Sequence, residues 1–298
     1  MNQQFRKGVH MHPNLFTKAY LTSDEILEVL DHALNSFNVT FDSDYSRDDI
    51  LVGFFTFADF PSVYERFCKK NFPSWLKEDY TNPAFYEYTC ASALYEGKYN
   101  GILINASVQC NYWRWYQILL HELSHLFASR NEYHGEKFYD KHCADQSISM
   151  QQDSTYLGYT IWKEFIADYM ACLAMPFEPE TSLARIKDNV NEDLDQIEDA
   201  TKYSMLAMTR VLSDIFTTKE FFACESWECF NGKLMKLQPS IHPALVEMFS
   251  VVYNHLKRLD REAYKIHEDF IAVIGSTFQS FVFHNQSNLL RNRLFGDE

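Results

Sequence analysis

Residues 119–127 read LLHELSHLF, and this stretch constrains the fold more than any other part of the chain. On an α-helix, His121 and His125 lie on one face, one turn apart, and Glu122 borders that face after a rotation of about 100°. The helix around them is apolar on nearly every side, through Trp113, Trp115, Ile118, Leu119, Leu120, Leu123, Leu126 and Phe127. A buried helix does not hold two histidines and a glutamate unless other groups pair with them. Two interpretations follow: a metal-binding catalytic helix, or a buried helix that happens to carry two histidines.

A second polar pair lies in the later segment WKEFIADYMACLAMP. Glu164 and Asp168 are again four residues apart on an apolar helix, where two acids need a cation or strong donors. A catalytic zinc has three protein ligands and one water. We therefore predict a Zn²⁺ site with the ligands His121, His125 and Glu164. In this site Glu122 is the base that takes a proton from the water, and Asp168 accepts a hydrogen bond from the first histidine. The alternative for the two acids is an exposed acidic edge on an ordinary helix.

The motif HELSH followed by E-x-x-A-D resembles the gluzincin metallopeptidases, in which two histidines and a downstream glutamate hold zinc. Within that group, GILIN, HELSH and EFIADYMACLAMP are similar to the ImmA/IrrE family of bacterial and phage metallopeptidases. The similarity covers residues 101–176. It implies a zincin-like fold, with His121, His125 and Glu164 as zinc ligands and Glu122 as the base.

The segment PSIHPALVEM resembles an H-P element of HtpX-type and phage-exclusion peptidases, in which a histidine near the metal steadies the charged intermediate. This resemblance implies that His242 donates a hydrogen bond to the oxyanion. An equally open alternative is a histidine at a helix start, beside Pro243 at the first helical position. Tyr133, His134 and Tyr169 are other candidates for this donor, and the sequence does not choose among them.

Composition and charge narrow the class of protein. The chain has 298 residues, 46% of them hydrophobic, which is enough for a substantial core. Its net charge of −14, without a basic run flanked by aromatics, predicts that it does not bind nucleic acid. It has no apolar run of secretory or membrane-spanning length, so we predict a cytoplasmic protein without a membrane partner. Seven scattered cysteines, an odd number, fit reduced thiols. The sequence carries no signal for an oligomeric state.

The N-terminal half reads as α+β. Thr22 and Glu25 form a capping box that starts the first helix. Residues 50–57 and 101–106 are branched and aromatic-rich and predict strands, with a helix at 62–72 between them.

The remainder of the chain reads as helix after one long loop. Residues 129–158 are polar without a clear period and predict that loop. Helices are expected at 160–174, 189–216, 243–258 and 261–283. We predict a single zincin-like domain of class α+β over 1–298, with the metal site in the α+β part, 1–176, and a helical part over 177–298.

These features predict a zinc-dependent endopeptidase that hydrolyses a peptide bond in a protein or peptide substrate. The rival prediction is a catalytically silent or latent zincin scaffold that binds or senses a protein partner. In that case the zinc has only a structural role. Hydrolysis of a non-peptide amide is a third possibility that uses the same residues. A structural zinc has four protein ligands, so a fourth ligand from the loop at 129–158 would favour the rival. The substrate and the cleavage site have no motif.

A second zinc site at Cys224, Cys229 and His242 is disfavoured. The cysteine spacing is not one of the usual short knuckles. The phenylalanines around the two cysteines instead indicate core packing: Phe221, Phe222 and Phe230.

Overall fold

The structure is a computed structural model that describes residues 15–76, 81, 89–131, 133, 154–176, 181–198, 204–239, 241–257 and 270–282. The chain forms two compact units. The first comprises Met1–Arg130 and Met170–Phe177, and the second Asn131–Tyr169 and Glu178–Glu298. Helix α6 (Ser154–Ala174) runs without a break through this division, so its last turn belongs to the first unit. The fold is α+β as predicted. That the two units make one domain stays a prediction.

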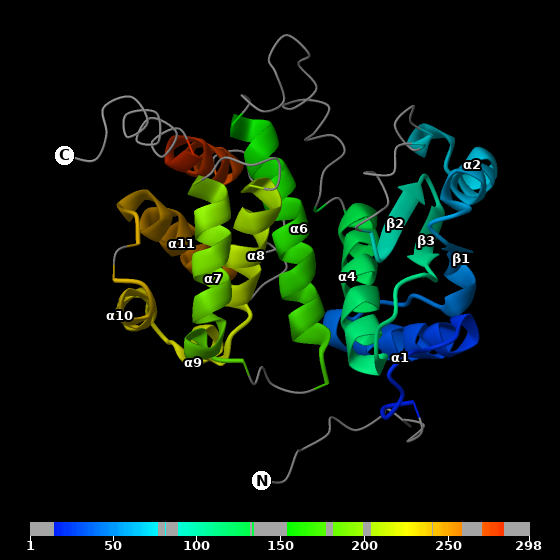
Figure 1. The fold of residues 1–298 in the computed structure, drawn as a ribbon, viewed down its shortest axis with the longest axis horizontal. Helices are drawn as coiled ribbons and strands as arrows, with labels where there is room; N and C mark the ends of the chain where they lie inside the picture. The colour runs from blue at the N-terminus through cyan, green and yellow to red at the C-terminus, as the bar shows by residue number, and fades with distance from the viewer. Residues whose placement is uncertain are drawn as a thin grey trace. The chain divides into compact units, whose positions relative to one another are not determined.

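The first unit contains a three-stranded mixed sheet with the order β1-β3-β2 (Figure 1). Strand β1 (Ile50–Phe55) runs parallel to the central strand β3 (Tyr99–Asn105), and β2 (Ala91–Glu96) runs antiparallel to it. The strands predicted at 50–57 and 101–106 are confirmed as β1 and β3. Strand β2 was not predicted. It joins β3 through a two-residue turn in which Gly97 has a φ of 58°, the left-handed region that glycine adopts without strain.

Three helices accompany the sheet in this unit. Helix α1 (Ser23–Phe41) begins with the predicted capping box of Thr22 and Glu25. Helix α2 (Phe60–Asn71), close to the prediction, packs on β1, and two 3₁₀ turns flank these elements, η1 (Arg47–Asp49) and η2 (Pro73–Trp75). Helix α4 (Tyr112–Arg130) packs against both α1 and β2. The ring of Phe127 on α4 lies 5.5 Å from the rings of both Phe37 and Phe41 on α1. The helix with the histidine pair is therefore buried, as its apolar surface predicts.

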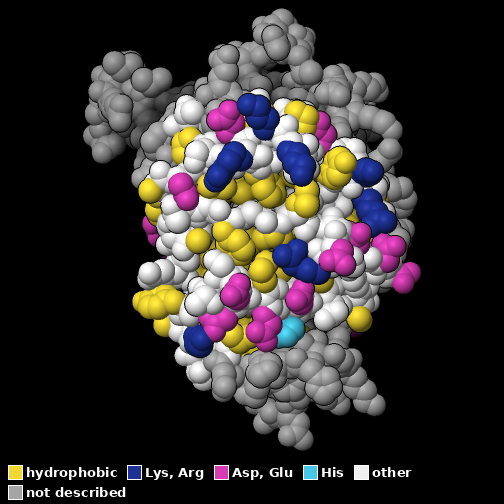
Figure 2. Space-filling view, turned by 90° about the vertical axis from the view of Figure 1, so that its right-hand side faces the viewer, with side chains coloured by type: hydrophobic (Ala, Val, Ile, Leu, Met, Phe, Trp, Pro, Cys, Tyr) yellow, Lys and Arg dark blue, Asp and Glu magenta, His cyan; other side chains and the backbone are white. Residues whose placement is uncertain are grey.

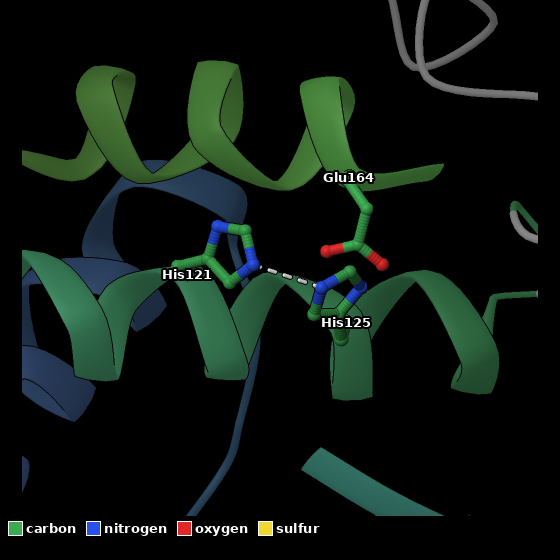
Figure 3. Close-up of side chains that lie close together, drawn as sticks. All are labelled: His121, His125 and Glu164. Carbon is green, nitrogen blue, oxygen red and sulfur yellow. Dashed lines mark hydrogen bonds between the residues drawn. The ribbon is translucent and has the colours of Figure 1, made fainter. Parts of the chain in front are cut away.

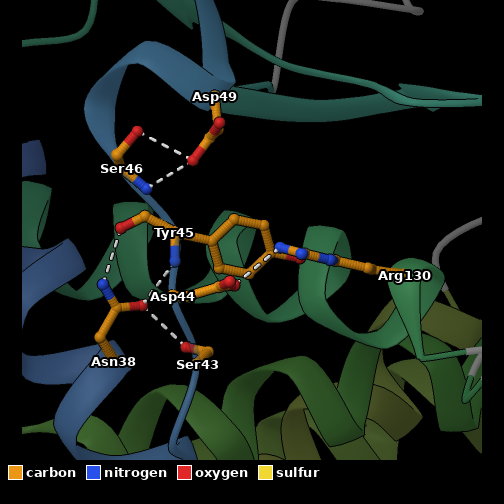
Figure 4. A network of polar contacts seen from close by, with 7 residues as sticks. All are labelled: Asn38, Ser43, Asp44, Tyr45, Ser46, Asp49 and Arg130. Carbon is orange, nitrogen blue, oxygen red and sulfur yellow. Dashed lines mark hydrogen bonds and ion pairs between the residues drawn. The ribbon is translucent and has the colours of Figure 1, made fainter.

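The side chain of Asn38 holds the loop after α1 (Figure 4). Its Nδ2 donates to the carbonyl of Tyr45 at 2.7 Å, and its Oδ1 accepts from Ser43 Oγ at 2.8 Å. Arg130, at the end of α4, lies 3.1 Å from Asp44 Oδ1 and covers the Tyr45 ring at 5.1 Å from its centroid. Burial raises the pKa of Tyr45 to about 12. These contacts tie the C-terminal end of α4 to the loop that follows α1.

The second unit is helical. It contains most of α6, then α7 (Leu183–Glu198), α8 (Ser204–Phe216), α9 (Lys219–Ala223), α10 (Trp227–Leu237), α11 (Pro243–Leu256) and a helical segment at residues 270–282. Its core is rich in fully buried aromatic side chains: Trp162, Phe165, Phe216, Phe221, Phe230 and Phe249. The prediction of a helical C-terminal part is confirmed for these residues.

Two helix boundaries in this unit differ from the predictions. The single helix expected at 189–216 is wrong, because α7 and α8 pack against each other as separate helices. Their apolar periods follow one another closely enough in sequence to be read as one helix. Helix α6 starts at Ser154, so the end of the predicted loop at 129–158 is helical. Residues 132 and 134–153 of that loop, and 261–269 of the last predicted helix, lie outside the described residues.

One face of the first unit shows how its surface charge is distributed. Figure 2 shows hydrophobic side chains in bands across this face, with most of the Lys and Arg in its upper part and most of the Asp and Glu in its lower part and at its right. The exposed large hydrophobic side chains of this unit include Leu51, Phe57 and Tyr99, with 38%, 44% and 45% of their surface exposed. In the part of the chain that the structure describes, no helix combines the length and the apolar character needed to cross a membrane.

Candidate metal centre

Helix α4 brings the two predicted histidine ligands together. The Nε2 atoms of His121 and His125 are 3.0 Å apart, and the two ring planes make an angle of 82° (Figure 3). Two nitrogens bound to one tetrahedral zinc at about 2.0–2.1 Å lie about 3.3 Å from each other. The pair is thus close to the spacing that a shared metal requires. Only 6% of the His125 surface is exposed, and His121 is half-buried.

Glu164 on α6 completes a group of three ligands. One ligand atom each from His121, His125 and Glu164 lie within 4.8 Å of one another, and Figure 3 shows the carboxylate directed toward the two rings. The Lys163 Nζ is also 3.7 Å from Glu164 Oε1, and 39% of the glutamate side chain is exposed. The alternative for this glutamate was an exposed acidic position on an ordinary helix. Its carboxylate is partly exposed, and what sets it apart from such a position is its closeness to the two imidazoles. The chain can therefore offer two imidazoles and one carboxylate to a metal ion.

Glu122 is held by the edge strand β2. The backbone N–H of Ala93 donates a hydrogen bond of 2.6 Å to Glu122 Oε2, and 6% of this glutamate is exposed. Ala93 faces Ile102 across the sheet, and its N–H points away from β3 toward α4. This contact was not predicted from the sequence, because strand β2 was not predicted. The available signal for a hairpin was the two-residue turn that begins at Gly97, shortly before GILIN.

Asp168 has a hydrogen-bond donor on α8. Ser213 Oγ donates to Asp168 Oδ2 at 2.6 Å. Nearby, Arg210 makes a two-point contact with the buried Asp193, with Nε 3.0 and 3.1 Å from the two carboxylate oxygens. Burial raises the pKa of Asp214 to about 6, helped by the charges of Asp193 and Asp168 and opposed by Arg210. The predicted bond from the first histidine ligand to Asp168 stays a prediction.

The structure gives His242 a capping role. Its Nδ1 accepts a hydrogen bond of 3.2 Å from Ala244 N at the start of α11, with Pro243 at the first helical position. The ring also lies 5.5 Å from the ring of Phe281. His242 is not in the three-residue metal group. Its helix-start role is confirmed, and its contact with an oxyanion stays a prediction.

The other candidate donors lie in different surroundings. Tyr169 is buried and stacks on Phe222 with ring centroids 6.1 Å apart. Tyr133 is also buried, and His134 lies outside the described residues. In the part of the chain that the structure describes, Cys224, Cys229 and His242 are not among the residues grouped as possible metal ligands.

Comparison with known proteins adds no family assignment. No protein-family model matches the chain, and the searches of curated proteins and of solved structures find no significant match. The resemblance of the sequence motifs to the gluzincins therefore stays a prediction.

Proposed function

We propose that the protein is a zinc-dependent endopeptidase with a zincin-like fold. The observation that carries this proposal is the approach of Glu164 to the Nε2 atoms of His121 and His125, with Glu122 at the next position of the same helix. Nitrogen and oxygen donors of this kind suit Zn²⁺, and three protein ligands leave a fourth position for water. The motif similarity to the ImmA/IrrE family supports the same assignment.

The residues of the chain have distinct roles in this proposal. When bound, zinc supplies a Lewis acid that polarises the scissile carbonyl and acidifies water. Glu122 accepts a proton from the attacking water and returns it to the departing nitrogen. The N–H of Ala93 fixes one carboxylate oxygen of Glu122, which limits rotation of the base. Asp168 accepts a hydrogen bond from His121 and so sets its tautomer.

The proposed substrate is a protein or peptide in the cytoplasm. Six cysteines among the described residues are not joined in disulfides, which supports a reducing compartment: Cys68, Cys90, Cys110, Cys172, Cys224 and Cys229. The net charge of −14 supports the exclusion of nucleic acid as a partner.

A paired measurement of metal content and cleavage tests this function. Zinc per chain is measured by elemental analysis, and new protein N-termini in a cell extract are compared after treatment with wild type and with Glu122→Gln. The variant should keep its zinc and generate no new N-termini, because it loses the base and no ligand. His125→Ala and Glu164→Ala should lose zinc.

The matched control is Glu247→Gln, an equally conservative change at an exposed position on α11. It should behave as wild type. Zinc binding without any cleavage that depends on Glu122 would favour the protein-binding scaffold. Absence of zinc from the wild-type protein would refute the metal centre itself.

A further inference from the structure

Cys224 and Cys229 place two sulfur atoms side by side between α9 and α10. Their Sγ atoms are 3.1 Å apart, and the S–H of Cys224 donates toward Cys229. A disulfide bond is about 2.03–2.05 Å long, so the two atoms need to approach by only about 1 Å to form one. Cys224 is 1% exposed, whereas Cys229 is exposed to solvent. This pair, the dithiol, thus combines one accessible thiol with one protected thiol.

Backbone contacts hold both cysteines in place. Cys224 caps the C-terminal end of α9, with its N–H donating to Glu220 O at 3.0 Å, and its carbonyl accepts from Tyr253 Oη at 3.0 Å. Cys229 lies in the first turn of α10, where its N–H donates to Ser226 Oγ at 3.3 Å.

The charges around the dithiol assign different roles to the two sulfurs. Burial raises the pKa of the Cys224 thiol, donation to Cys229 raises it further, and the nearby Lys233 opposes this. Cys224 therefore stays protonated and acts as the hydrogen-bond donor. Lys257 approaches from the C-terminal end of α11, where its Nζ donates to Phe221 O at 3.1 Å. Burial lowers the pKa of Lys257, and the Cys224 sulfur opposes this effect. Two lysines thus supply positive charge close to the sulfurs.

A metal does not account for this arrangement. Among the described residues, the dithiol has no third histidine, cysteine or acidic ligand in a metal-binding group. Closely spaced thiols with one exposed member and nearby positive charge are typical of thiol–disulfide exchange.

We propose that Cys224 and Cys229 form a reversible disulfide by exchange with a low-molecular-weight disulfide such as oxidised glutathione. The Cys229 thiolate attacks one sulfur of the small disulfide, which forms a mixed disulfide and releases one small thiol. The Cys224 thiol then gives up its proton and attacks the Cys229 sulfur, which releases the second small thiol. The two cysteines are oxidised, the small disulfide is reduced to two thiols, and the two cysteine protons end on those thiols. The step uses no residue of the proposed metal centre, so its test is independent of the peptidase assignment.

The experiment follows one tryptic peptide of the full chain. Trypsin cuts after Lys219 and Lys233, which releases residues 220–233 with Cys224 and Cys229 as their only cysteines. The folded protein is incubated with oxidised glutathione and a metal chelator, quenched in acid, alkylated, digested and analysed by mass spectrometry. In the wild-type peptide we expect loss of both alkylation sites, a mass lower by two hydrogens, and recovery of both sites after treatment with dithiothreitol.

Two single variants separate the two steps. Cys224→Ser should accumulate one glutathione on Cys229, because the resolving thiol is absent. Cys229→Ser should leave Cys224 without glutathione, because that thiol is buried. A wild-type peptide that retains glutathione as Cys224→Ser does, or that keeps both thiols throughout, would overturn the proposal. The wild-type measurement needs no variant, so misfolding of a serine variant does not remove the test.

Discussion

The backbone N–H of Ala93 donates a 2.6 Å hydrogen bond to the carboxylate of Glu122. This contact joins the edge strand β2 to α4 and uses one oxygen of the residue that we propose as the base. A glutamine side chain also has an oxygen that can accept this hydrogen bond. Glu122→Gln therefore removes the proposed base and keeps the contact with β2, so the two roles of Glu122 can be tested separately.

Substitutions of Glu122 should therefore differ in stability according to whether they keep that oxygen. Glu122→Gln retains an acceptor for the Ala93 N–H and should unfold within about 1 kcal/mol of wild type. Glu122→Ala leaves that buried N–H without its partner and should lose about 1–3 kcal/mol. Urea unfolding of both variants, without metal, provides the measurement. Equal stability of the two variants would show that the hydrogen bond contributes little.

Ser213 gives a way to test the role of Asp168 at a distance from the ligands. If Asp168 orients His121, Asp168→Asn should weaken zinc binding by about 10–100-fold, the usual effect of losing a partner of a metal ligand. Ser213→Ala should cause a smaller loss, because Ser213 acts only through its 2.6 Å bond to Asp168. Competition with a chromophoric chelator measures both affinities.

Ser213→Thr keeps the hydroxyl and serves as the control for Ser213→Ala. It should restore zinc affinity toward wild type. Zinc affinity that does not change in Asp168→Asn would count against the proposed bond between Asp168 and His121.

Alanine substitutions at two helical glycines should change the stability of the protein in opposite directions. A Cβ added at Gly275 would lie 1.6 Å from the carbonyl oxygen of Ser154 and 2.8 Å from Gly158 N, both backbone atoms of α6. The backbone has to move, so Gly275→Ala should destabilise the protein by about 1–3 kcal/mol or more. A Cβ at Gly232 in α10 would meet no atom within 4 Å. Gly232→Ala should therefore stabilise the protein by about 0.5–1 kcal/mol. Thermal unfolding measures both changes. A Gly275→Ala variant as stable as wild type would contradict the helix contact, and a destabilised Gly232→Ala variant would contradict the open space at that position.

The parts of the site that depend on local geometry could be predicted from the sequence. The spacing of His121 and His125 places both rings on one face of any helix, whatever surrounds it. The pattern of Glu164 within an apolar segment pointed to the third member of the group of possible ligands, although its side chain is 39% exposed rather than buried. The capping box of Thr22 and Glu25 was equally local.

The parts that depend on tertiary contacts could not be predicted. The segment ASALYE of β2 contains two alanines and a serine, residues with weak strand preference, and a backbone amide such as that of Ala93 has no sequence signature. Ser213 lies on a different helix from Asp168, and nothing in the spacing of the two residues indicates their contact. The separation of α7 from α8 was missed because amphipathic periodicity reports which residues are buried, not where a chain reverses.

Asp214 should give the second unit a stability that depends on pH. Its pKa is raised from 3.8 to about 6, chiefly by burial and then by Asp193 and Asp168. A raised carboxyl pKa favours the protonated folded form, so the contribution of Asp214 to stability is complete below about pH 4 and is lost as the pH rises through about 6.

Asp214→Asn removes the ionisable group. At pH 8 it should stabilise the protein by about 1–2 kcal/mol, after allowance for solvent screening of the part-exposed side chain, and this gain should disappear below about pH 4. Urea unfolding at a series of pH values measures the difference, with Asp188→Asn at an exposed position of α7 as the control. A gain that stayed constant between pH 4 and 8 would mean that the ionisation of Asp214 does not oppose folding.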